Sequence, residues 1–117
     1  MGKKFDKEEA KKFLFQREEK KREEQEKERK RVLQKAISIL EKEFKGSDVE
    51  IYLVGSVLRP FSFSSQSDVD VVLKNYKGDR FEFWVNLEKK IGRDVEIISF
   101  ETCQFQESIL KDGLKVV

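Results

Sequence analysis

The sequence predicts an α/β or α+β protein in which a small sheet is covered by helices and preceded by a long charged helix. Three observations lead to this fold class. Residues 1–45 are dense in charge and favour a helix, the hydrophobic period changes to that of strands at Val49, and strand-like and helix-like segments alternate after that point. With 117 residues, the chain can bury one small core.

The N-terminal segment has the features of a solvated helix. Asp6 and Glu9 have the spacing of an N-cap and its capping-box partner, so the helix is expected to begin near Lys7. Residues 16–31 contain no apolar side chain, and several Glu residues precede Lys or Arg by four positions, the favourable order. We expect this stretch to form a helix that does not touch a core.

Apolar residues return at helical spacing over residues 32–44, and Gly46 follows as a helix end. This pattern predicts an amphipathic helix that packs on the sheet. The sequence leaves open whether residues 7–44 form one continuous helix. We expect a charged helical extension over residues 1–31 and a domain over residues 32–117.

The second half of the chain predicts three strands and two further helices. The strands are expected at residues 49–54, 69–73 and 95–99, and the helices at residues 80–91 and 101–111. Asp79 is placed to cap the first of these helices, and Gly92 is placed to end it.

Most aromatic side chains of this half are predicted to be in the core. On the helix at residues 80–91, the face expected to pack inward carries Phe81, Trp84, Val85, Glu88 and Ile91. On the last helix it carries Phe105, Ile109 and Leu110. Phe61 and Phe63 lie in a serine-rich loop, where core packing and stacking on a base are equally reasonable expectations.

The composition excludes several classes of site. There is no histidine, which removes Ser-His-Asp triads, histidine acid–base catalysis and ordinary zinc sites. Cys103 is the only cysteine, so no internal disulfide can form. Metal chemistry would therefore use carboxylates and hard cations such as Mg²⁺. No apolar run is long enough for a membrane span, and the charged start of the chain does not suit a signal peptide, so we expect a cytoplasmic protein.

Two carboxylates mark the strongest candidate site. Asp68 and Asp70 stand two residues apart at the start of a predicted strand, so both should project from one face while the valines that alternate with them point to the core. Such a pair suits a divalent cation, although the pattern alone more often marks an exposed turn. Gly55-Ser56 strengthens the prediction of a metal site. A glycine turn after an apolar strand presents backbone amides to a phosphate, so that a phosphate and its metal would be held side by side.

A family resemblance is carried by the segment YLVGSVLRPFSFSSQSDVDVVL, which is similar to the signature of the minimal nucleotidyltransferases of the DNA polymerase beta superfamily. In that family an apolar strand, a Gly-Ser pair and a loop precede Asp-x-Asp on a second strand. The resemblance continues through GRDVEIIS, where the family has a third acid on a neighbouring strand, and through the ending ILKDGLKVV. It covers about residues 33–117.

The resemblance implies an α+β nucleotidyltransferase fold with a small mixed sheet flanked by helices. It also implies Mg²⁺-dependent transfer of an NMP group, as AMP from ATP, to an acceptor hydroxyl. Asp68, Asp70 and Glu96 would be the catalytic and metal-binding residues, holding two Mg²⁺ ions that bridge the triphosphate. Glu96 would also help to activate the acceptor hydroxyl. Gly55, Ser56 and Ser67 would contact the nucleotide.

Three features depart from the family pattern. The loop before Asp68 has eleven residues, one more than many relatives have, and Pro60 replaces a glycine that usually follows Arg59. The third acid is Glu96 where Asp is common, and the longer side chain would shift metal geometry at a cost in rate. Asp94, two residues earlier, is a weaker candidate for that role.

The resemblance also implies partners. Many similar small proteins are encoded beside a helical toxin of the HEPN type and act as antitoxins, by binding or by adenylylating that partner. The alternative is a catalytically silent module of the same fold that assembles with itself or with a partner through the charged helix. An RNA-binding helix is a third alternative, disfavoured because Glu residues are interleaved with the basic ones over residues 16–31.

Overall fold

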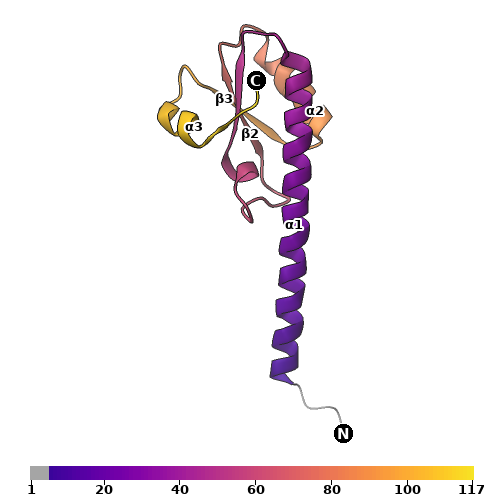
Figure 1. Cartoon of the computed structure of the whole chain (residues 1–117). Coiled ribbons are helices and arrows are strands. Elements are labelled where there is room, and N and C mark those ends of the chain that lie inside the picture. Colours follow the sequence, from indigo (N-terminus) through magenta and orange to yellow (C-terminus); the bar gives the residue numbers. More distant parts are fainter. Residues whose placement is uncertain (1–5) are drawn as a thin grey trace.

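The computed structural model describes residues 6–117 as a four-stranded sheet with three α-helices, one of which projects far beyond the sheet (Figure 1). In chain order the elements are α1 (Lys7–Phe44), β1 (Glu50–Val54), the 3-10 turn η1 (Gly55–Leu58), β2 (Val69–Lys74), α2 (Arg80–Ile91), β3 (Val95–Ser99), α3 (Gln106–Asp112) and β4 (Leu114–Lys115). The predicted α+β class, with a mixed sheet and a long N-terminal helix, is confirmed. No helix in this described part is long and apolar enough to cross a membrane.

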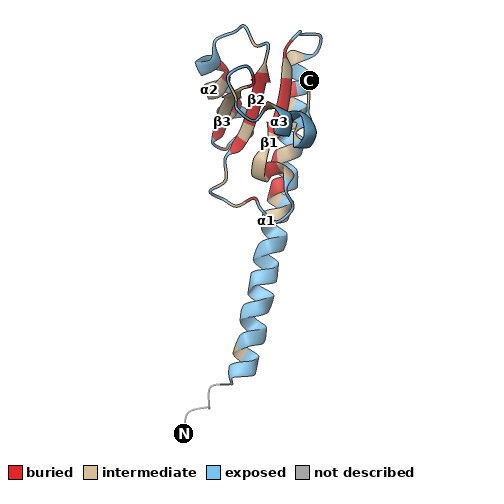
Figure 2. Cartoon of the chain, turned by 90° about the vertical axis from the view of Figure 1, so that its left-hand side faces the viewer, coloured by how far each residue is buried: buried red, intermediate tan, exposed pale blue. Residues whose placement is uncertain are grey.

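The long charged segment is one continuous helix, which answers the question that the sequence left open. The carboxylate of Asp6 caps it by accepting hydrogen bonds from the backbone N–H groups of Glu8 (3.0 Å) and Glu9 (3.2 Å). The N-terminal half of α1 is exposed, whereas its C-terminal half lies against the sheet (Figure 2). The predicted apolar stripe is buried there through Val32, Ala36 and Leu40.

Contact between α1 and the rest of the chain begins before that apolar stripe. The expectation that residues 16–31 touch no core is wrong, because Arg29 is only 7% exposed. Its Nη1 donates to the carbonyl of Val57 at 3.0 Å, and its Nε donates to Glu26 at 3.0 Å. A guanidinium can be buried when its charge is paired and its donors are satisfied. The packed part of α1 therefore reaches back to Glu26, beyond the boundary expected at residue 32.

The strands are arranged in the order β3–β2–β1–β4. β1 is antiparallel to both β2 and β4, whereas β2 and β3 are parallel and are connected through α2. β4 was not predicted, because its two residues are too few to show a strand period.

The two faces of the sheet are covered unequally. One face packs against α1 and α2 to form the main core, in which Leu53 and Val71 are fully buried. The other face carries a smaller cluster made by Tyr52, Val72, Phe100 and, from α3, Ile109. The second face is therefore the one with room for a site.

The second helix begins and ends as predicted but turns a different side to the core. Asp79 caps it, and Gly92 closes it in the left-handed conformation, with φ 78°. The buried side chains are Phe83, Leu87 and Ile91. Phe81, which was expected in the core, is 69% exposed, and Trp84 is half-buried. The buried stripe is wholly apolar, whereas the predicted stripe would have placed Glu88 among core residues.

The last helix is shorter than predicted, because it begins at Gln106 instead of Glu101. The Glu101 carboxylate accepts a hydrogen bond from the backbone N–H of Asn75 at 2.6 Å, which holds this residue in a turn beside β2. The predicted apolar face is also wrong in part. Ile109 is buried, but Phe105 and Leu110 are 52% and 56% exposed.

Candidate functional site

Asp70 and Glu96 lie side by side on adjacent parallel strands, since they are register partners in β2 and β3. Strands in a sheet are about 4.8 Å apart, which places the two carboxylates within contact of each other. Because side chains alternate along a strand, both project from the sparsely covered face of the sheet. Val69 and Val71, on either side of Asp70 in the sequence, are fully buried in the main core.

Burial, together with the neighbouring Glu96, changes the acidity of Asp70. Its pKa is raised from 3.8 to about 6, first because burial disfavours the charged form, and then because of the negative charge of Glu96. A hydrogen bond to Glu96 and the charge of Asp68 act in the same direction. Two carboxylates that repel each other in this way are relieved by a bound cation or by a proton.

Asp68, the first acid of the predicted Asp-x-Asp motif, lies at the edge of the Asp70–Glu96 pair. It is exposed and lines a shallow recess together with Glu96, Arg80 and Trp84, whereas Asp70 lines a deeper cavity. Glu96 lines both. Within residues 6–117, no three His, Cys, Asp or Glu side chains are gathered closely enough to hold a metal ion in their present conformations.

Asp94, the weaker candidate for the third acid, faces another part of the surface. It is exposed and lines a recess with Ser67 and Arg93, away from the cavity that Asp70 lines. The structure therefore brings Glu96, and not Asp94, next to Asp70.

Gly55 forms the sharp turn between β1 and η1. Its φ is 82°, a left-handed conformation that glycine adopts without strain. A Cβ atom at this position would collide with the carboxylate of Asp70. Ser56 follows in η1, and its carbonyl accepts a hydrogen bond from the backbone N–H of Arg59 at 3.1 Å. The Gly-Ser turn and the acidic pair are thus in direct contact.

A cavity of about 510 Å³ opens on the acidic face of the sheet. Gly55, Asp70 and Glu96 line it together with Phe105 from the start of α3, and Arg59 adds a positive charge. Its volume falls within the roughly 300–1,000 Å³ typical of small-molecule sites. Neither Ser56 nor Ser67, both predicted to contact a nucleotide, is among its lining residues.

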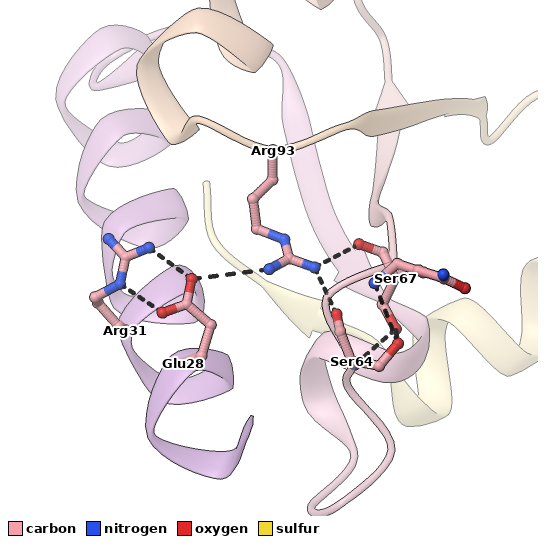
Figure 3. A network of polar contacts seen from close by, with 6 residues as sticks. Glu28, Arg31, Ser64, Ser67 and Arg93 are labelled. Atoms are coloured by element: carbon pink, nitrogen blue, oxygen red, sulfur yellow. Dashed lines mark hydrogen bonds and ion pairs between the residues drawn. The ribbon is translucent and has the colours of Figure 1, made fainter. Parts of the chain in front are cut away.

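The loop between η1 and β2 is held by Arg93. The Nη2 of Arg93 donates to the carbonyls of Ser64 (2.6 Å) and Ser67 (2.9 Å), and its guanidinium carbon lies 4.3 Å from the centre of the buried Phe63 ring. The Nη1 of Arg93 is 3.7 Å from Glu28 of α1 (Figure 3). The Ser67 hydroxyl accepts from the backbone N–H of Ser64 at 2.9 Å, so it closes the loop.

Glu26 of α1 holds the same loop at a second point. Its carboxylate accepts from the backbone N–H of Phe61 at 2.9 Å. Phe61 is 68% exposed and has φ 62°, a conformation that bulky side chains rarely adopt. Hydrogen bonding from Arg29, and then from Phe61, lowers the pKa of Glu26 to about 2. Of the two loop phenylalanines, Phe63 therefore belongs to the core, whereas the side chain of Phe61 is exposed to solvent.

Sequence reasoning missed the residues that hold this loop. Arg29 could have been found, because it precedes the buried Ala36 by seven residues and so continues the same helix face. Arg93 and Glu28 gave no such signal, because their role depends on where the loop folds back.

Comparison with models of known protein families gave no match for this chain, and a search among curated proteins also found none.

Proposed function

We propose that the protein is a minimal nucleotidyltransferase that moves an NMP group, as AMP from ATP, to an acceptor hydroxyl in a Mg²⁺-dependent reaction. The observation that carries this proposal is the contact of the Gly55 turn with the Asp70–Glu96 pair at the edge of a nucleotide-sized cavity. The family resemblance of the same segment supports it.

The donor set fits a hard divalent cation, because it consists of carboxylates that repel one another until a positive charge separates them. Asp70 and Glu96 would hold the ion, and Asp68, being exposed, is free to turn toward them. Bound Mg²⁺ would neutralise phosphate charge while the acceptor hydroxyl attacks the α-phosphorus and pyrophosphate leaves. Within the cavity, Arg59 would bind phosphate oxygens, and the half-exposed Phe105 offers a ring face for the base.

Calorimetry with ATP, with and without Mg²⁺, tests the site. We expect Mg²⁺-dependent binding by the wild type, and no detectable binding by Asp70→Asn or by the Asp68→Asn/Asp70→Asn double variant. Asp48→Asn is the matched control, since Asp48 is exposed in the turn before β1. Glu96→Gln should weaken binding more than Asp94→Asn does. A wild type that does not bind nucleotide would overturn the proposal.

A second candidate is a catalytically silent module of the same fold that acts by binding. It is favoured by Phe13, Leu14 and Phe15, which are 64%, 55% and 62% exposed. They lie on the free half of α1, its N-terminal part before Glu26. A helical toxin of the HEPN type is the partner that the family resemblance proposes. ATP labelled in its α-phosphate separates the two functions. Transfer of the label to any acceptor requires the enzyme, whereas nucleotide binding without transfer favours the binding module.

A further inference from the structure

The free half of α1 carries a charge pattern that is complementary to its own reverse. Phe15 lies at the centre of one helix face, with Glu8, Lys11 and Lys12 before it and Glu18, Glu19 and Arg22 after it, all exposed. Read along the helix the signs are minus, plus, plus, phenylalanine, minus, minus, plus. Read backwards, every sign is opposite.

We propose that two copies of this chain associate through this face of α1, antiparallel and centred on Phe15. In that register Glu8 meets Arg22 of the second copy, Lys11 meets Glu19 and Lys12 meets Glu18, and each contact occurs twice by symmetry. The two Phe15 rings cover each other. A parallel pair in register would instead oppose equal charges along its whole length.

The length of the free helix fits this register. With Phe15 at the centre, Lys7 of one copy lies opposite Glu23 of the other. The overlap ends just before Glu26, where α1 first contacts its own loop. A seven-residue spacing also links Phe15 through Arg22 to the buried Arg29, so the face proposed for the second copy continues the face that packs on the sheet.

Variants that reverse single charges test the register. The strength of self-association is measured by sedimentation or light scattering over a range of concentrations. Lys11→Glu places equal charges together twice in each dimer, so we expect association roughly tenfold weaker. Lys11→Glu/Glu19→Lys restores opposite charges only between copies, because the two residues are about 12 Å apart along one helix. The double variant should therefore associate like the wild type. Lys20→Glu, the same charge change on the opposite face, is the control and should have no effect.

A wild type that is monomeric at its highest soluble concentration overturns the proposal, and so does a double variant no tighter than Lys11→Glu. Helix content by circular dichroism shows whether each variant keeps α1. Cysteine pairing checks the direction in a Cys103→Ser background. Glu8→Cys should cross-link only when combined with Arg22→Cys, since antiparallel copies hold the two Glu8 positions about 21 Å apart. Cross-linking of Glu8→Cys alone indicates a parallel pair and overturns the register.

Discussion

The carboxylate of Asp70 touches the backbone turn at Gly55, and burial raises the pKa of this carboxyl. Gly55 directly follows Val54, the last residue of β1, and Val54 is the register partner of Asp70 on β2. The positions of the Gly55 turn, of Asp70 and of Glu96 on β3 are therefore set by the pairing of three adjacent strands. Their mutual placement does not depend on the long loop that separates them in the sequence.

Asp70→Asn should stabilise the protein at neutral pH. The folded-state pKa of Asp70 is about 6 against an ordinary 3.8, so the free-energy cost of its ionisation is absent below about pH 4, grows between about pH 4 and 6, and is complete above about pH 6. Because the carboxyl is only partly buried, screening reduces the gain to about 1 kcal/mol. Urea unfolding at pH 7.5 and pH 4 should show a gain at the higher pH alone. Asp48→Asn should show none, and a gain that is equal at both pH values would contradict the assignment.

Gly55→Ala should destabilise the protein and abolish nucleotide binding. The left-handed φ of 82° is strained for alanine, and the added Cβ collides with the Asp70 carboxylate. Together these two effects should cost about 2–3 kcal/mol. Gly46→Ala is the matched control, because Gly46 has φ 81° and no atom within 4 Å of an added Cβ. It should lose only the backbone component, about 1 kcal/mol. Equal losses in thermal or urea unfolding would show that the Asp70 contact is unimportant.

Arg93→Ala should loosen the loop before Asp68. Two carbonyls, those of Ser64 and Ser67, lose their donor, and we expect a loss of about 2–3 kcal/mol with faster amide exchange in the loop. Arg93→Lys should not rescue it, because a single ammonium lacks the planar fork. Arg31→Ala removes an exposed partner of Glu28 and should cost much less stability than Arg93→Ala. Unchanged amide exchange of the loop in Arg93→Ala would show that Arg93 does not hold it.

Glu26→Gln should flatten the acid limb of the stability curve. The pKa of Glu26 is lowered from 4.5 to about 2, so its contribution is complete above pH 4.5 and is lost as pH falls through about 2. Wild type and variant should therefore differ in urea midpoint at pH 7 and converge near pH 2. The same offset at both pH values would mean that the ion pair with Arg29 does not act through its charge.

Local sequence signals were enough for most of the fold. The cap residues Asp6 and Asp79 and the terminator Gly92 set the ends of two helices, because capping depends on neighbouring residues only. The alternation around Asp70 likewise placed its side chain on the face away from the main core.

What depended on distant partners could not be predicted. The ring of Phe83 packs against Phe44 of α1 and against Tyr76, which both lie outside α2. The helix face of Arg29 could be predicted, but its hydrogen-bond partner, the carbonyl of Val57 twenty-eight residues away, could not. Such contacts leave no local period in the sequence.

The contacts between α1 and the loop before Asp68 join the exposed helix to the candidate site. Val57 and Phe61 are tied to α1 directly, and Ser64 and Ser67 are tied to it through Arg93. Phe15, on the exposed half of α1, and Arg29, which contacts the loop that leads into the acidic pair, therefore lie on one unbroken helix, about 21 Å apart along its axis.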